Sequence, residues 1–419
     1  MGNEIKKLCK FLIGYKENQT NGKYEPLMPL NPTKLETTSS NKYFQVESRN
    51  NSNMIFKPDL NDIKTRHFRS NTYVASKEIT INDFQKLKLI GKGSFGKVFL
   101  VKNIRNNKFY ALKILVKDLI RQKRQVIHTK TEREILEKMD HPFIVKLKYA
   151  FQDDNKLYML TKFLQGGDLF FHLKNENVFS EERTKFYACQ IILALEYLHR
   201  NKVIYRDLKP ENIILDSKGN MKLIDFGLSK LFNHSRNSIL FNSNKAYTIC
   251  GTPDYLAPEV LLNQGYDKNV DWWSLGTVIY EMLVGISPFK QAKVSEKIDI
   301  NTYLKPIDIP KNISESARSL IVGLLQKDPS KRLGNGTKDS ISIKEHPFFK
   351  DIIWDDVYYK RMKPVFIPSL KSDIDISYFD TNFTSQKLTE EVVFLKQTQR
   401  ISCNDPFEKF NFIPKKEKI

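Results

Sequence analysis

Regular apolar patterning is confined to residues 84–349, so only this part of the 419-residue chain can build a folded core. Residues 1–83 are rich in Asn, Thr, Ser and Lys, and we expect most of them to form a flexible extension. Residues 350–419 lose regular periodicity but keep spaced aromatic side chains, which indicates a tail that wraps another surface.

The early part of the folded region is typical of strands and the later part of helices. Short runs rich in β-branched and aromatic residues predict the strands. Apolar residues at helical spacing, preceded by the candidate N-caps Ser180 and Ser314, predict the helices. Strands first and helices later predict an α+β chain in two lobes. The predicted strands are 86–90, 97–102 and 108–115, and the predicted helices include 125–139 and 181–200.

The charge of the chain permits two interpretations. Lys and Arg number 68 against 48 Asp and Glu, a formal net charge of +20. This excess is compatible with binding to nucleic acid or an anionic membrane. The positive residues are spread along the whole chain without a dominant block, which favours a Lys-rich surface and no specific nucleic-acid partner.

Two compositional features concern the compartment. The four cysteines lie far apart without a C-x-x-C pair, so we expect neither a disulfide framework nor a zinc site, and a reducing compartment fits. The longest apolar run, 191–195, is much shorter than the roughly 18–20 residues that a membrane-spanning helix needs. We therefore expect a cytoplasmic protein, with membrane association or a nuclear location as alternatives.

A glycine-rich motif, GKGSFGKV, occupies residues 91–98. A dinucleotide-binding fingerprint would continue into a helix, but the residues that follow are typical of a strand. Glycines between two strands allow backbone amides to approach phosphate closely. A plain hairpin turn is the alternative.

A single lysine interrupts the apolar run at 109–115, inside the strand predicted at 108–115. Alternation places Ala111 and Lys113 on the same face. An unpaired lysine is costly to bury, so Lys113 requires anionic partners, which Glu132 and nucleotide phosphates would provide. The alternative is a lysine at the strand edge whose ammonium reaches solvent.

The most specific motif is YRDLKPEN at 205–212, followed by DFG, which starts at Asp225. So many ionic groups in a short run are not expected in a core. Asp207 can accept a hydroxyl proton, and Lys209 can neutralise a transferring phosphoryl group. Asn212 and Asp225 offer hard oxygen ligands, which together with phosphates are typical of a magnesium site.

With these motifs the chain resembles the eukaryotic protein kinases over residues 84–349. The glycine-rich loop, Lys113, the Asp207 loop, DFG and APE at 257–259 follow in the family's order. Tyr205 stands where many kinases have His. Together with CGTP and DWWSLG, it resembles the AGC group of serine/threonine kinases, nearest to its protein-kinase-B, SGK and ribosomal-protein-kinase branches.

The resemblance implies a bilobal kinase fold with a small β-rich N-lobe (about 84–163), a larger helical C-lobe (about 164–349) and the AGC C-terminal tail (350–419). It implies ATP-dependent phosphorylation of serine or threonine in signal transduction, with Mg²⁺ as the metal. A pseudokinase scaffold and a basic nucleic-acid or membrane binder are the alternatives. The intact catalytic motifs disfavour the scaffold.

The resemblance also assigns the nucleotide and metal residues. Thr161 falls at the gatekeeper position, and Lys162 replaces the usual hinge glutamate. The implied catalytic residues are Asp207, Lys209 and Asn212, and the implied metal ligands are Asn212 and Asp225. The implied ATP-binding residues are Ile90, Gly91, Lys92, Gly93, Ser94, Phe95, Gly96, Lys97, Val98, Ala111, Lys113, Glu132, Leu164 and Ile214.

Substrate recognition is implied at four positions. Asp168, Glu211 and Glu281 match AGC positions that recognise arginine upstream of the acceptor, and the alternative is surface acids paired with nearby lysines. Thr252, together with Lys209 next to Asp207, marks a serine/threonine acceptor and not tyrosine. We therefore expect protein substrates with basic residues before Ser or Thr.

Thr248 falls at the activation-loop phosphosite, which implies an upstream activating kinase. A phosphate there adds about two negative charges. Its expected partners are Arg206, Lys230 and His128. The loop from Asp225 to Thr248 is longer than is usual in the group, and we assign no function to the extra residues.

The C-terminal FEKFNF resembles the AGC hydrophobic motif. Phe407, Phe410 and Phe412 are expected to dock in a groove beside the helix of Glu132. Asn411 stands where that motif has a phosphorylatable residue, so we expect docking to be constitutive.

The N-terminal Met1-Gly2 partly matches a myristoylation signal, because Lys6 occupies a position where Ser or Thr is preferred. Lipidation of Gly2 would give a membrane contact, and ordinary use of glycine is the alternative. We expect the protein to be a monomer.

Overall fold

The computed structural model describes residues 79–93, 95–232, 245–290, 301–386, 388 and 405–414. The predictions for residues 1–78, including Gly2, lie outside this part of the chain. So do Ser94 and residues 233–244 of the long activation loop.

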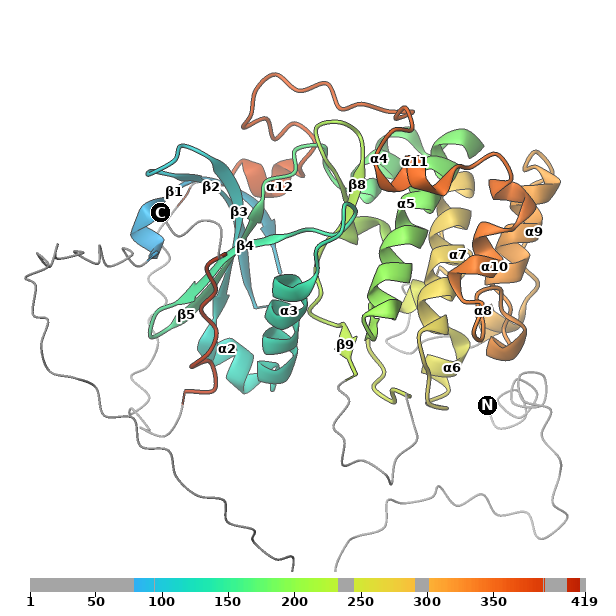
Figure 1. The fold of residues 1–419 in the computed structure, drawn as a ribbon, viewed down its shortest axis with the longest axis horizontal. Coiled ribbons are helices and arrows are strands. Elements are labelled where there is room, and N and C mark those ends of the chain that lie inside the picture. Colours follow the sequence, from blue (N-terminus) through green and yellow to red (C-terminus); the bar gives the residue numbers. More distant parts are fainter. Residues whose placement is uncertain are drawn as a thin grey trace, which may run out of the picture. The chain divides into compact units, whose positions relative to one another are not determined.

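A five-stranded antiparallel sheet forms the N-lobe (Figure 1), with the strand order β1-β2-β3-β5-β4. Two helices connect β3 to β4. The short helix η1 (Ile81–Asp83) precedes the sheet. The elements are β1 (Phe84–Lys92), β2 (Gly96–Asn103), β3 (Phe109–Val116), α2 (Lys117–Gln122), α3 (Val126–Lys138), β4 (Leu147–Gln152) and β5 (Lys156–Lys162).

The alternation of side chains along β3 divides the sheet into two faces. Tyr110, Leu112 and Ile114 join a buried cluster on one face. Ala111 and Lys113 lie on the opposite face and line a cavity. One face of β3 therefore packs in the apolar core of the N-lobe, and the other face lines the cavity.

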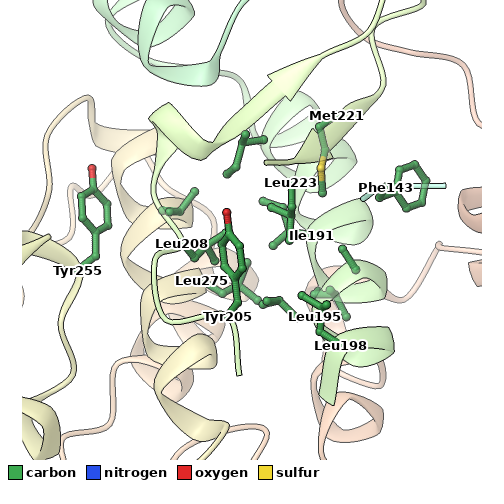
Figure 2. Close-up of a cluster of buried hydrophobic side chains, with 14 of the residues drawn as sticks. Phe143, Ile191, Leu195, Leu198, Tyr205, Leu208, Met221, Leu223, Tyr255 and Leu275 are labelled. Carbon is green, nitrogen blue, oxygen red and sulfur yellow. The ribbon is translucent and has the colours of Figure 1, made fainter. Parts of the chain in front are cut away.

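The C-lobe is mainly helical and is built around α5 (Glu181–Arg200) and α7 (Asn269–Val284). Every residue of α7 from Asn269 to Leu283 is buried, as expected for a helix in the centre of a lobe. Figure 2 shows the core beside these helices, where Tyr205 lies among leucine side chains. The other helices are α4 (Leu169–Glu176), α6 (Pro258–Leu261), α8 (Asn301–Leu304), α9 (Glu315–Leu324) and α10 (Ser340–Lys344), with the short helices η2 (Pro210–Asn212), η3 (Pro253–Tyr255), η4 (Pro329–Lys331) and η5 (Pro347–Phe349).

Two predicted helix starts are confirmed. The side chain of Ser180 accepts a hydrogen bond from the backbone N–H of Arg183 at the start of α5. Ser314 accepts one from Ala317 at the start of α9. Each cap satisfies a backbone donor that has no partner within its helix.

Short two-stranded sheets in the C-lobe carry the polar motifs. β6 (Val203–Ile204) pairs with β9 (Lys230–Leu231), and β7 (Ile213–Leu215) pairs with β8 (Met221–Leu223). The YRDLKPEN motif follows β6, and DFG lies between β8 and β9. The bilobal α+β fold predicted from the sequence is confirmed. None of the described helices is long and apolar enough to span a bilayer.

The tail packs across both lobes. It contains α11 (Trp354–Tyr358) and α12 (Thr381–Thr384). The ring of Phe366 contacts His172 in the C-lobe at 4.9 Å, and Phe379 stacks on Phe163 at 5.7 Å. Gly167 has φ +74°, and an added Cβ would lie 2.5 Å from the carbonyl oxygen of Tyr378. Only glycine allows the tail to approach this closely.

Candidate active site

A cavity of about 240 Å³ lies between the sheet of the N-lobe and the polar loops of the C-lobe. Most of the predicted nucleotide residues lie along it. Lys92, Gly93, Phe95, Gly96 and Lys97 instead belong to the adjoining β1–β2 loop and its strands, and Ser94 is not described. The predicted residues that line the cavity are Ile90, Gly91, Val98, Ala111, Lys113, Glu132, Leu164 and Ile214.

The glycine-rich loop is a strand–turn–strand unit and not the strand–helix unit of a dinucleotide fold. The backbone N–H of Gly93 donates to the carbonyl oxygen of Gly96 at 2.9 Å and closes the turn. A Cβ on Gly96 would lie 1.8 Å from the carbonyl oxygen of Ile114, so only glycine fits where β2 meets β3. This geometry favours a phosphate-covering flap.

Lys113 lies between two carboxylates. Its Nζ is 2.6 Å from Oε1 of Glu132 on α3 and 3.4 Å from Oδ1 of Asp225. Burial alone would lower the pKa of Lys113, but the charges of Asp225 and Glu132 outweigh it and raise that pKa. The ammonium of Lys113 lowers the pKa of Asp225. Burial raises the pKa of Glu132, and Lys113 opposes that rise. Lys113 and Asp225 are therefore both charged at neutral pH.

A second ionic cluster surrounds Asp207. Its Oδ2 accepts a hydrogen bond from Asn212 Nδ2 at 2.7 Å and lies 3.2 Å from Lys209 Nζ. Lys209 also donates to Thr252 Oγ1 at 2.8 Å. Burial raises the pKa of Asp207, opposed by Lys209 and Asn212. Its Oδ1 has no hydrogen-bond partner among the described residues, so this oxygen keeps its full capacity to accept a hydrogen bond.

Asp271 on α7 fixes the loop that carries Asp207. Its side chain is fully buried, and it accepts hydrogen bonds from the backbone N–H groups of Tyr205 and Arg206 at 2.9 and 2.8 Å. The hydroxyl of Tyr205 donates to the carbonyl oxygen of Ile224, next to Asp225, and its ring contacts Phe226 at 5.2 Å. Tyr205 therefore connects the Asp207 loop to DFG.

Phe379 is a cavity residue that sequence analysis did not assign. It comes from the tail and lines the cavity beside Leu164 and Phe163. In the sequence, Phe379 was only one of the spaced aromatic residues of the tail, and nothing assigned it to the cavity. The tail thus contributes directly to the wall of the site.

Among the three predicted substrate-recognition acids, Glu211 lies close enough to influence both Asp168 and Glu281. Burial first, and the charge of Glu211 after it, raise the pKa of Asp168 to about 6 and that of Glu281 to about 7. Asp168 accepts from the backbone N–H of Phe171 at 2.7 Å, and Glu281 accepts from the hydroxyl of Tyr255 at 2.6 Å. Glu211 Oε2 is buried and has no hydrogen-bond partner among the described residues. The cluster therefore favours a cation.

Thr248 is exposed beside a basic cluster. The hydroxyl of Tyr266 donates to its carbonyl oxygen at 2.7 Å and accepts from Arg206 at 3.0 Å. Burial, together with the neighbouring charge of Arg206, lowers the pKa of both Lys230 and His128. The three predicted partners of a phosphate at Thr248 thus lie near one another.

The aromatic residues at the end of the tail lie against the N-lobe. Phe407 and Phe410 are buried, and Phe412 is partly buried. Phe412 forms an antiparallel bridge with Ala150 of β4, with hydrogen bonds of 2.7 and 3.0 Å. Figure 1 shows this dark red segment beside β4 and α2.

The fold and the two ionic clusters define a protein kinase, and comparison with known proteins agrees. The family model for the protein kinase domain matches residues 84–349, and the chain belongs to this family. It is 45% identical to the RAC-beta serine/threonine-protein kinases of Rattus norvegicus and Homo sapiens over 315 residues, which is 75% of this chain and 64% of each relative. The Mus musculus protein is 43% identical over 334 residues, 80% of this chain and 67% of the relative.

These relatives are AGC kinases, so the resemblance to that group is confirmed. The chain spans less than two thirds of the length of the rat and human relatives that it matches.

Proteins of this family use ATP with Mg²⁺. The residues in and beside the cavity fit both the nucleotide and the metal. The side chains of Lys113 and Asp225 are 28% and 47% exposed, so both are accessible from the cavity. Asn212 donates its amide group to Asp207, which leaves its carbonyl oxygen as an acceptor for a cation. Asp225 and Asn212 would hold the metal, and Lys113 with the glycine-rich loop would hold the phosphates.

Proposed function

We propose that this chain is a serine/threonine protein kinase that transfers the γ-phosphoryl group of Mg-ATP to protein hydroxyls. The observation that carries the proposal is the closeness of two ionic clusters. Lys113, Glu132 and Asp225 line the cavity. Asp207, Lys209 and Asn212 form the second cluster, and the charges of Asp207 and Lys209 interact with that of Asp225. A scaffold protein that only binds partners does not need both ionic clusters.

The residues divide the chemistry between them. Asp207 accepts and orients the substrate hydroxyl through its unpartnered oxygen. Lys209, held by Thr252, supplies positive charge where phosphoryl charge develops. Lys113 orients the phosphates because Glu132 fixes its ammonium. Positioning and fixed charge account for most of the catalysis in such a transfer.

Transfer of labelled phosphate tests the proposal. The purified chain is incubated with γ-labelled ATP and a peptide that contains Arg before a single Ser, with and without Mg²⁺. We expect label on the serine only when the metal is present. A chain that binds Mg-ATP but labels no hydroxyl would be a pseudokinase, and the proposal would be wrong.

We propose that the substrates carry arginine upstream of the acceptor. Support comes from the acidic cluster of Asp168, Glu211 and Glu281, because the charge of Glu211 helps to raise the pKa of the other two carboxyl groups and a cationic partner would relieve that repulsion. A peptide library in which upstream Arg gives no advantage would contradict this.

The same cluster predicts a pH dependence of substrate binding. A guanidinium binds the ionised carboxylates, and at pH 6 about nine tenths of a carboxyl with a pKa of about 7, that of Glu281, is protonated. We expect the KM for an Arg-containing peptide to rise by about tenfold between pH 8 and pH 6. The KM for ATP, and the peptide KM with Gln in place of Arg, should change much less.

Phosphorylation of Thr248 by an upstream kinase is proposed as the activating event. Its support is the cluster of Arg206, Lys230 and His128 near this exposed residue. We expect Thr248→Ala to lower kcat by about tenfold or more, because charge-assisted contacts that order the loop are lost. Phosphatase treatment should lower the activity of the wild type to the same level and leave the variant unchanged. Equal turnover by variant and untreated wild type would contradict the prediction.

Other expectations remain proposals. Lipidation of Gly2 and a membrane contact through it concern residues outside the described part of the chain. A monomeric protein in the cytoplasm, with membrane or nuclear association as alternatives, is our working assignment. Mass spectrometry of the N-terminus of the native protein tests the lipidation directly.

A further inference from the structure

An ion cluster lies at one end of the docked segment, residues 405–412. Oδ2 of Asp405 lies 2.8 Å from Lys117 Nζ, and Oδ1 lies 3.3 Å from a guanidinium nitrogen of Arg121. Both basic residues belong to α2. Lys117 is only 2% exposed, and its ammonium lies 5.8 Å from the ring centre of Phe407. A buried ammonium is costly without a counter-charge, so Asp405 stabilises the docked arrangement.

The other end of the docked segment is fixed to α3 and β4. Arg133 donates to the carbonyl oxygens of Phe410 and Asn411, both at 3.1 Å. Phe412 pairs with Ala150 through backbone hydrogen bonds. Arg133 directly follows Glu132 in the sequence of α3, so the segment contacts the helix that holds the partner of Lys113.

The charge of the docked segment is set by its sequence. Residues 405–414 read DPFEKFNFIP and contain no Ser, Thr or Tyr that could be phosphorylated. Glu408, the second acid of the segment, is exposed and forms no ion pair with the described residues. Burial would raise the pKa of Asp405, but Lys117, the backbone N–H of Phe407 and Arg121 bring that pKa below its usual value. Asp405 is therefore a permanent anion at neutral pH.

We propose that Asp405 is a positioning residue: its carboxylate anchors residues 405–412 to α2 and α3 and so holds Glu132 against Lys113. The anchor is the permanent acid at the start of the segment and requires no added phosphate. The consequence for turnover rests on the proposed kinase function, whereas the docking itself does not.

Amide hydrogen exchange in the full chain tests the anchor. The reporters are the amides of Phe412 and Ala150, because their hydrogen bonds exist only while the segment is docked. We expect Asp405→Asn to accelerate exchange at both by about 5- to 30-fold. It should also accelerate exchange in α3 and leave the central helix α7 unchanged. Asp405→Glu should restore most of the protection, and the matched control Glu408→Gln should behave as wild type.

Steady-state kinetics on the same four proteins test the positioning. We expect Asp405→Asn to lower kcat with little change in the KM for the peptide, and Asp405→Glu to recover it. Exchange in Asp405→Asn no faster than in Glu408→Gln would overturn the anchor. Faster exchange at Phe412 with unchanged α3 protection would overturn the positioning of Glu132. A wild type that transfers no phosphate would refute the proposed function, and the exchange results would still decide the anchor and the effect on α3.

Discussion

Asp207→Ala is expected to lower kcat by about 10²–10⁴-fold, the range that one positioned acid–base group contributes. One carboxylate oxygen of Asp207 is held by Asn212 and Lys209, and the other has no hydrogen-bond partner within the described part of the chain. The variant loses the group that faces the acceptor hydroxyl. It retains Lys113, Glu132 and Asp225, which form a separate cluster.

Two measurements separate loss of chemistry from loss of structure in this variant. Mg-ATP should raise the Tm of Asp207→Ala by about as much as that of the wild type, since a ligand that binds only the folded state stabilises it. The KM for ATP should change much less than kcat. If the variant retained more than a tenth of wild-type kcat, the assignment of Asp207 would be wrong. If Mg-ATP no longer stabilised it, the loss of activity would say nothing about proton transfer.

The local part of the site could be predicted from the sequence because each motif is short and continuous. Alternation along β3 gave the correct face for Ala111 and Lys113. Hydroxyl side chains before apolar helices gave the correct N-caps at Ser180 and Ser314. These features depend on backbone geometry over a few residues, which the order of residues determines directly.

The remaining parts of the site depend on contacts between distant segments. Phe379 enters the cavity wall because the tail passes over Gly167 at van der Waals distance. Asp405 is separated from Lys117 by 288 positions, and no local pattern in the tail indicates that ion pair. In the sequence, Asp271 stood out only as the first residue of the DWWSLG motif. Its hydrogen bonds to the Asp207 loop form only when α7 packs against that loop.

Glu259→Ala is expected to lower the free energy of unfolding by about 3–5 kcal/mol, because it leaves a buried guanidinium without its carboxylate. Arg332 makes two short contacts to Glu259, at 2.7 and 2.9 Å, and its side chain is fully buried. Its remaining acceptors are the carbonyl oxygens of Asn269 and Gln326, which carry no net charge. The fall in Tm should be about 10 °C.

An exposed ion pair provides the matched control for this prediction. Arg361 contacts Asp356 at 2.6 Å, but its side chain is 55% exposed, so Asp356→Asn should cost less than about 1 kcal/mol. The double variant Glu259→Leu with Arg332→Met should be more stable than Glu259→Ala, because it removes the unpaired charge along with its partner. If Glu259→Ala and Asp356→Asn lowered the free energy of unfolding by the same small amount, the prediction that burial makes the Glu259–Arg332 pair more important than an exposed pair would be wrong.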